Sequence, residues 1–329
     1  MKYQYKAVSI SSVIKNILSA RGYQGSIAGV YKKAVNIKFG NYLITAADLN
    51  QRNLPYGILC DFSDIDLQNV LYDGDAAEIN SERLFVRNRF FEISINSASI
   101  WSPEFYIPIQ RKDVPSIKRN IEFIKKQIIQ ANILDGLIPL FRYLPNLMNS
   151  VSSEKISDSL LNQKAYESLR EFIKAIRNFD EGLLIGEFKQ LTGLGIGLTP
   201  SGDDILMGLL ATLIITSKAP YRNWVMNIFD KILPQIKGLT NDVSINYHKA
   251  ISQGYYPERF SNLISAIITA KSFANVQPAM QEMLKWGQTS GYEIILGIII
   301  GFLLSIENLK EPNKPFSSDY NDSLKQLIQ

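Results

Sequence analysis

The stretch Gly197–Leu210, with the sequence GLTPSGDDILMGLL, is nearly repeated later in the chain by Gly287–Ile299, with the sequence GQTSGYEIILGII. Aligned on Ser-Gly, each stretch has an acidic residue two positions after the glycine and another glycine four positions after the acid. Equivalent residues, such as Gly202 and Gly291, are always 89 positions apart. The pattern predicts two similar buried helices, each of which begins at a small polar loop.

The start of a helix leaves backbone N–H groups without an internal partner and carries a partial positive charge. Two such starts brought together would form one anion site between the repeated helices. We therefore expect the functional site where the two Ser-Gly loops converge. The residues expected to bind an anion from these loops are Gly195, Gly197, Thr199, Ser201, Gly202, Gln288, Thr289, Ser290 and Gly291.

The first loop has the features of a helix start that something approaches closely. Its alternating glycines allow unusual backbone angles. Thr199 is a good N-cap residue, and Pro200 suits the first helical position. Gly202 in the first turn costs about 1 kcal/mol relative to alanine, which is understandable if another group lies against the backbone. No lysine follows the glycines, so the loop is not a P-loop.

The acids of the two copies, Asp203, Asp204 and Glu293, are the candidate catalytic residues. Small residues recur at four-residue spacing after Asp204 and after Glu293, which lets two helix axes approach closely. In a parallel pair the two acids would lie together, and buried neighbouring carboxylates require a metal, a shared proton or a basic partner. Asp204 and Glu293 are therefore the expected ligands if a cation such as Mg²⁺ is bound. The alternative is that the acids only favour the helix dipole.

A third segment, Leu239–Ser244, lies between the two copies and precedes another predicted helix. Thr240 or Asn241 can cap that helix. Thr240 and Ser244 are further candidates for contact with the anion.

The composition excludes several classes of function. The 329 residues, 46% of them hydrophobic, suffice for a large core and for two domains. Because 35 basic residues nearly balance 31 acidic ones without a basic run, we expect no nucleic-acid groove. The single cysteine and the absence of a signal-peptide pattern predict a cytoplasmic protein. The longest apolar runs, Ile205–Ile215 and Ile294–Leu304, are shorter than the roughly 18 residues of a membrane span, so no membrane partner is expected.

The single histidine, His248, excludes a multi-histidine metal site within one chain. A Ser-His-Asp triad would have to use it, but no nucleophile turn is visible in the sequence. We expect His248 to be a surface or partly buried residue of a helix.

The pattern along the chain predicts an α+β protein. A short helix over 11–20 precedes strand-like runs at 26–31, 34–39, 42–46, 56–60, 84–86 and 90–95, which predict a β-rich barrel or sandwich domain over residues 1–110. From residue 111 to 329 the apolar spacing becomes helical and predicts a larger all-helical domain. The predicted helices are 114–131, 133–148, 158–178, 181–190, 200–216, 222–237, 241–253, 257–272, 278–285 and 291–306. The segment 149–159 resembles a linker, and the polar tail after Asn308 predicts no regular structure.

The block Gly193–Asp204 resembles the main signature of the family of AllH-type subunits of bacterial oxamate carbamoyltransferase. The segments Thr240–Ser244 and Gly287–Gly297 resemble further blocks of that family, and Asn53–Ile58 resembles its pattern more loosely. The sequence departs from the family at Gln288, where a histidine is common, and at Glu293, where an aspartate is common.

This resemblance implies a subunit of an enzyme that handles carbamoyl phosphate, oxamate and oxalurate in anaerobic allantoin degradation, one route of purine catabolism. It implies a small anionic substrate and partner subunits encoded in the same operon. Catalysis would depend on orientation and charge stabilisation, since no strong nucleophile is evident. The alternative is a non-catalytic anion-binding or assembly subunit, and a metal-dependent hydrolase would need further carboxylates at the site.

Overall fold

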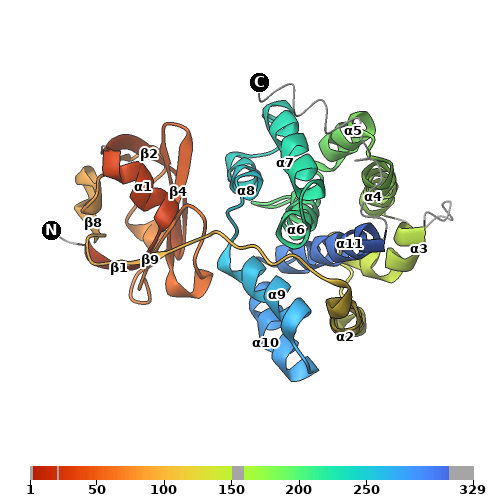
Figure 1. The fold of residues 1–329 in the computed structure, drawn as a ribbon. Helices are drawn as coiled ribbons and strands as arrows, with labels where there is room; N and C mark the ends of the chain where they lie inside the picture. The colour runs from red at the N-terminus through yellow and green to blue at the C-terminus, as the bar shows by residue number, and fades with distance from the viewer. Residues whose placement is uncertain (1–2, 21, 150–158, 311–329) are drawn as a thin grey trace, which may run out of the picture. The chain divides into compact units, whose positions relative to one another are not determined.

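A computed structural model of the chain describes residues 3–20, 22–149 and 159–310. The expected linker falls almost entirely, and the expected tail largely, outside these residues. The chain divides into two compact units. One comprises Met1–Phe105 with Lys249–Ser261, and the other comprises Tyr106–His248 with Asn262–Gln329. Figure 1 shows the strands in the first unit and most of the helices in the second.

The first unit is built on a β-barrel. Its sheet has the order β5-β4-β3-β2-β6-β7-β8-β1-β9, and an additional antiparallel pairing of β1 with β5 closes eight of the strands into a ring. The barrel predicted for this region is therefore confirmed. The strands are β1 (Tyr3–Ser11), β2 (Tyr23–Tyr31), β3 (Ala34–Phe39), β4 (Tyr42–Asp48), β5 (Gly57–Cys60), β6 (Ala76–Ile79), β7 (Arg83–Val86), β8 (Phe91–Ser94) and β9 (Ser99–Trp101).

Alternation of side chains explains how these strands form the barrel core. In β3, Val35, Ile37 and Phe39 are buried, since alternate residues of a strand face the same side. Helix α1 (Ser12–Ala20) contributes Ile14 and Leu18 to the same core. Together these side chains fill the interior of the ring.

Three of the strands, β1, β6 and β9, were missed in the sequence. β6 contains two alanines and a glutamate, which have low strand propensity, and β9 has only three residues. In β1 the exposure of the side chains does alternate, since Tyr3 and Tyr5 are less exposed than their neighbours. However, β1 closes the barrel by pairing with three different strands, β5, β8 and β9, and this pairing cannot be read from the local sequence.

The barrel unit includes a segment from much later in the chain. The main-chain N–H and the Nδ2 of Asn53 both donate to Glu258 Oε2, at 3.0 and 2.8 Å. Tyr56 Oη donates to Gln253 Oε1 at 2.7 Å. The Asn53–Ile58 motif therefore has a structural use, because its polar groups hold this segment against the barrel.

The helical part confirms most of the predicted helices. They are α2 (Val114–Ala131), α3 (Leu144–Asn149), α4 (Leu160–Asn178), α5 (Glu181–Leu191), α6 (Ser201–Thr216), α7 (Tyr221–Ile232), α8 (Asp242–Ser252), α9 (Glu258–Thr269), α10 (Phe273–Leu284) and α11 (Ser290–Lys310).

Three predicted helices are wrong in their extent. The one predicted over 222–237 ends at Ile232 as α7, and a 3₁₀ turn, Leu233–Gln235, follows it. The region 133–148 is a 3₁₀ helix, Ile138–Tyr143, followed by α3, because Gly136 has a φ of 56° and Pro139 and Pro145 interrupt the backbone hydrogen bonds. Helix α10 begins at Phe273 and contains Pro278, which the sequence placed at its start.

The two repeated helices, α6 and α11, form the centre of the helical unit (Figure 1). All sixteen residues of α6 are buried, so this helix has no polar face. Helix α11 is longer than its apolar run suggested and has the length and hydropathy of a membrane span. Because 72% of its apolar window is buried within the unit, we assign it as a core helix.

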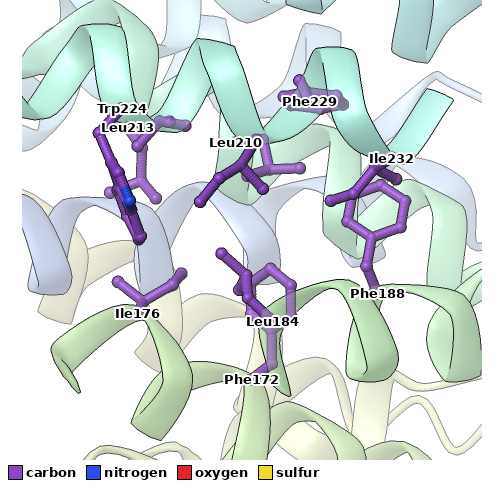
Figure 2. A pocket seen from close by; sticks show the side chains of 11 residues that line it. Phe172, Ile176, Leu184, Phe188, Leu210, Leu213, Trp224, Phe229 and Ile232 are labelled. Atoms are coloured by element: carbon purple, nitrogen blue, oxygen red, sulfur yellow. The ribbon is translucent and has the colours of Figure 1, made fainter. Parts of the chain in front are cut away.

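An apolar cavity lies between α4, α5, α6 and α7, and Figure 2 shows the side chains that line it. The volume open to the centre of a water molecule is about 10 Å³. This space corresponds to one water at most, and its lining is almost entirely apolar. The cavity is therefore a gap in the core rather than a substrate site.

Candidate functional site

The two Ser-Gly loops converge, as the repeat predicts. Thr199 Oγ1, just before α6, lies 3.1 Å from Ser290 Oγ, the first residue of α11. The loops therefore meet through a pair of hydroxyl groups.

Below the loops, α6 and α11 touch along their glycines. A Cβ atom on Gly208 would lie 2.2 Å from the Ile294 carbonyl oxygen, and one on Gly297 would lie 2.0 Å from the Ile205 carbonyl oxygen. Further along, Thr216 Oγ1 and Ser305 Oγ are 2.8 Å apart, again with the offset of 89 residues. Because contacts advance in the same direction on both helices, the pair is parallel. The predicted close glycine contact is confirmed.

Asp204 is fully buried at the start of α6. Its Oδ2 accepts a hydrogen bond from Thr199 Oγ1 at 3.1 Å, and its Oδ1 has no partner among the described residues. Burial raises the pKa of Asp204 well above its usual value, and the negative charges of Glu293 and Asp203 raise it further. Hydrogen bonds from Ser290 and Thr199 act in the opposite direction but do not cancel these effects. Asp204 is therefore a carboxyl group that retains its proton more readily than an exposed aspartate.

Glu293, the equivalent acid of α11, is also fully buried. Its Oε1 accepts the main-chain N–H of Leu137 at 2.9 Å, and its Oε2 has no partner in the described structure. The preceding residue, Gly136, is so close that a Cβ there would lie 2.3 Å from Oε1. This wall of the site was missed, because nothing in the local sequence relates Gly136 to the repeat.

Asp203 has a different environment from its neighbour. Its Oδ2 accepts the main-chain N–H of Gly193 at 3.2 Å and the hydroxyl of Thr240 at 2.7 Å. Its Oδ1 lies 3.2 Å from His248 Nε2. All of these partners belong to the chain, so the carboxylate holds together the glycine loop, the segment before α8 and α8 itself.

The expectation that His248 is a surface or partly buried residue is wrong. The side chain is fully buried, and its ring contacts those of Phe188 and Phe229. His248 and Ser244 lie one helical turn apart on α8, and Ser244 is also fully buried. His248 Nδ1 and Ser244 Oγ have no hydrogen-bond partner in the described part of the chain. The signal in the sequence was the spacing of Ser244 and His248, which are four residues apart and therefore lie on the same face of one helix.

The capping residues differ from the expected ones. The N-cap of α6 is Pro200 rather than Thr199, and it makes no side-chain cap bond. The Thr199 hydroxyl instead donates to Asp204. At α8, Asn241 Oδ1 accepts the N–H groups of Val243 and Ser244, both at 3.0 Å, which confirms one of the two expected caps.

Gly202 and Gly291 are glycines for a reason other than the expected one. A Cβ on Gly202 would lie 2.0 Å from the Leu191 carbonyl oxygen, and one on Gly291 would lie 2.2 Å from that of Met283. Their N–H groups donate to the carbonyl oxygens of Leu194 and Trp286, respectively, both at 2.8 Å. The close approach at each glycine is thus made by the chain's own backbone.

The remaining candidate residues lie nearer the surface. Gly197 and Gln288 are exposed, and Gly195, Thr240, Thr289 and Ser290 are partly buried, whereas Ser201 is buried. Gly195 and Gly197 have φ angles of 109° and 117°, which only glycine adopts easily. The site therefore has three buried acids beneath a rim of glycines, hydroxyls and one amide.

No lysine or arginine is bonded to Asp203, Asp204 or Glu293 in the described structure. Among the described residues there is also no group of three His, Cys, Asp or Glu side chains that could hold a metal ion. The unpartnered atoms Asp204 Oδ1 and Glu293 Oε2 are carboxyl oxygens, and an ionised one only accepts hydrogen bonds. Such a site is suited to an amide, an ammonium group or a cation.

We expect Asp203→Ala to destabilise the chain by about 3 kcal/mol, because it leaves the Gly193 N–H, the Thr240 hydroxyl and His248 without their acceptor. Urea unfolding of the full chain measures this loss. The control is Asp230→Ala on the exposed face of α7, for which we expect less than about 0.5 kcal/mol. Equal stability of the two variants would show that the buried network contributes little.

Two family models match the chain. Residues 191–302, which include both Ser-Gly loops and α8, match the model described as oxamate carbamoyltransferase subunit AllH. Residues 6–100, which run from within β1 to within β9, match the model of the AllH family N-terminal domain. No solved structure gives a significant match. Since the two matches together cover most of the sequence and follow one another in the chain, the protein belongs to the AllH family.

Proposed function

We propose that this chain is a subunit of a cytoplasmic carbamoyltransferase that acts on oxamate or a related small carboxylate. The family description supports the reaction type and the existence of partner subunits. A role in allantoin degradation, and hence in purine catabolism, is part of the same proposal.

One observation carries the assignment of the site. At the paired starts of α6 and α11, two buried carboxyl groups each have one oxygen without a partner among the described residues, Asp204 Oδ1 and Glu293 Oε2. Leaving such groups unpaired is costly, so their retention favours a ligand that donates hydrogen bonds. Oxamate and carbamoyl phosphate both carry an amide NH₂ group, which is a donor of this kind.

The other end of either substrate is an anion. We propose that the carboxylate or phosphate lies against the rim, where the hydroxyls of Ser201 and Ser290 and the starts of the two helices favour negative charge. The N–H groups of Gly202 and Gly291 are already bonded within the chain, so the proposed anion contacts are hydroxyls and the remaining N–H groups.

The proposed reaction joins the amide nitrogen of oxamate to the carbamoyl carbon of carbamoyl phosphate. The bond from that carbon to the phosphate oxygen breaks, inorganic phosphate leaves, and the nitrogen gives up one proton. We propose that Glu293 Oε2 accepts this proton and that Asp204, with its raised pKa, orients the amide as a neutral carboxyl group. The products are oxalurate and phosphate.

Magnesium is the cation for which this oxygen donor set is best suited, and Asp204 and Glu293 would be its ligands. When bound, Mg²⁺ would offset the charge of the phosphate. If the reaction requires it, removal of divalent ions with EDTA should abolish turnover, and added Mg²⁺ should restore it. Full activity in EDTA would show that the reaction does not require a divalent ion and that Asp204 and Glu293 are not metal ligands.

The alternative function is a non-catalytic assembly subunit. It is favoured by Asp203, whose oxygens are all satisfied within the chain, and by the complete burial of Asp204 and Glu293. In this case the acids would only stabilise the meeting of the two helices.

The test is an assay of the chain alone and after reconstitution with the other proteins of its operon. Carbamoyl phosphate and oxamate are supplied, and oxalurate and phosphate are measured. Turnover that requires this chain supports the proposal. Full turnover by the partners without this chain would favour the assembly function.

A further inference from the structure

A buried asparagine of a third helix, Asn162, contacts the wall of the site. It lies in the first turn of α4. Its Nδ2 donates to the Gly136 carbonyl oxygen at 3.3 Å, and its Oδ1 has no partner among the described residues. Because an unpaired buried acceptor is costly, the stability of the fold alone does not explain an asparagine at this position.

One peptide group joins Asn162 to Glu293. The carbonyl oxygen of Gly136 accepts the hydrogen bond from Asn162, and the N–H of the same peptide group, which belongs to Leu137, donates to Glu293 Oε1 at 2.9 Å. A peptide group is planar, so a bond that fixes its carbonyl also fixes the direction of its N–H. A hydrogen bond accepted by the carbonyl further polarises the N–H and strengthens its donation.

This peptide group lies against both repeated helices. A Cβ on Gly136 would lie 2.3 Å from Glu293 Oε1 on α11 and 3.5 Å from Ser201 Oγ on α6. Gly136 has a φ of 56°, a conformation that favours glycine, and glycine restricts its own backbone less than other residues do. The orientation of the peptide group therefore depends on the hydrogen bonds at its two ends.

The two oxygens of Glu293 have different surroundings. Oε1 is held by the Leu137 N–H, and Oε2 has no partner in the described structure. A carboxyl group is rigid, so the bond to Oε1 also sets the direction in which Oε2 points. A displacement of about 1 Å at a reacting group can cost on the order of a hundredfold in rate. The hold on Oε1 thus matters for whatever Oε2 does.

We propose that Asn162 is a positioning residue, which fixes the peptide group of Gly136 and Leu137 and through it aims Glu293 Oε2 at the substrate nitrogen. This inference rests on the proposed function, because it requires that Glu293 accepts a proton. It adds a residue of α4 to a site that is otherwise built from the two repeated helices.

The first test measures hydrogen exchange of the Leu137 amide by NMR in the full chain. Asn162→Ala removes the donor without adding bulk, and we expect exchange at Leu137 to become at least tenfold faster. The matched control is Asn120→Ala, since Asn120 is also buried and its Nδ2 donates to the carbonyl oxygens of Ile267 and Ala270, both at 3.0 Å. After correction for the free energy of unfolding of each variant, the control should leave the exchange of Leu137 unchanged.

The second test measures turnover in the reconstituted enzyme. Asn162→Ala should lower kcat at least tenfold and change KM for carbamoyl phosphate less than twofold, because the phosphate is proposed to lie at the rim. Asn120→Ala should keep the kcat of wild type. When Glu293→Gln is already present, Asn162→Ala should cause no further loss, whereas an asparagine that acts independently of Glu293 would lower kcat by the same factor. If Asn162→Ala does not fold, Asn162→Ser takes its place in both tests.

The two tests separate the possible failures. Unchanged exchange at Leu137 in Asn162→Ala would overturn the inference and leave the proposed function standing. Faster exchange with wild-type kcat would show that Asn162 holds the peptide group without serving the reaction, which also overturns the inference. If the wild-type enzyme has no turnover with its partners present, the proposed function fails, and the catalytic role of Asn162 fails with it.

Discussion

Asp204→Asn and Glu293→Gln are each expected to reduce carbamoyl transfer at least a hundredfold while the chain remains folded. Both acids are fully buried at equivalent positions of paired helices, and within the part of the chain that the structure describes each retains one oxygen without a partner. A neutral amide has nearly the same shape as a carboxyl group. Glu293→Gln cannot accept the proton from the substrate nitrogen, and Asp204→Asn replaces the O–H of the neutral carboxyl group with an NH₂ group, which changes how the substrate amide is oriented. The measurement is turnover in the reconstituted enzyme, beside urea unfolding of each variant.

The effect of pH on stability tests whether Asp204 keeps its proton in the folded protein. The pKa of Asp204 is raised in the folded state, so the folded protein retains a proton that the unfolded chain releases above about pH 4. Stability therefore falls as the pH rises from that value toward the folded pKa. In Asp204→Asn this dependence should be absent. The free energy of unfolding of the variant, relative to that of wild type, should therefore be higher at pH 8 than at pH 5. Full activity in both acid variants would instead favour the assembly function.

Gly297→Ala is expected to destabilise the chain by about 3 kcal/mol or more, a large effect for one methyl group. The added Cβ would lie 2.0 Å from the Ile205 carbonyl oxygen and 2.8 Å from the Leu209 main-chain nitrogen, so the two helix backbones must separate. Gly208→Ala meets the Ile294 carbonyl oxygen at 2.2 Å and should have a similar effect. Because the loops with the acids lie at the end of this contact, any folded fraction should also lose activity.

The control is Gly186→Ala on the exposed face of α5, where a Cβ meets nothing within 4 Å. Alanine favours the helix there, so this variant should gain about 0.5–1 kcal/mol. Urea unfolding of all three variants measures the difference. If Gly297→Ala is as stable as wild type, the close contact of the two helices is wrong.

Much of the helical fold could be predicted, because its information is local. The repeated acid–glycine spacing predicted two helices in close contact, and the position of Gly208 against Ile294 confirms it. That the pair is parallel was left open by the sequence and is decided by the structure. Helix α2 was predicted with its observed bounds, since its apolar residues recur at helical spacing. Pro139 and Pro145 were the signal in the sequence that 133–148 could not be one helix.

The surroundings of the acids could not be predicted, because their partners are distant in the chain. Glu293 is held by the N–H of Leu137, which is 156 residues away. His248 meets Asp203 across 45 residues, and its polar neighbours gave it the appearance of a surface residue. Backbone donors carry no signal in the residue type, so only the tertiary structure identifies them.

The sequence by itself determined the class of fold, the two helix starts and the acids of the candidate site, because periodicity and helix-start chemistry act between residues close in the chain. The tertiary structure decided which of those groups is satisfied. It closed the barrel through β1, assigned Asp203 to a network within the chain, and left Asp204 and Glu293 each with an oxygen that no described residue bonds. The physical reason is that burial and hydrogen bonding depend on which distant segments meet, and these together set the charge and the availability of each carboxyl group.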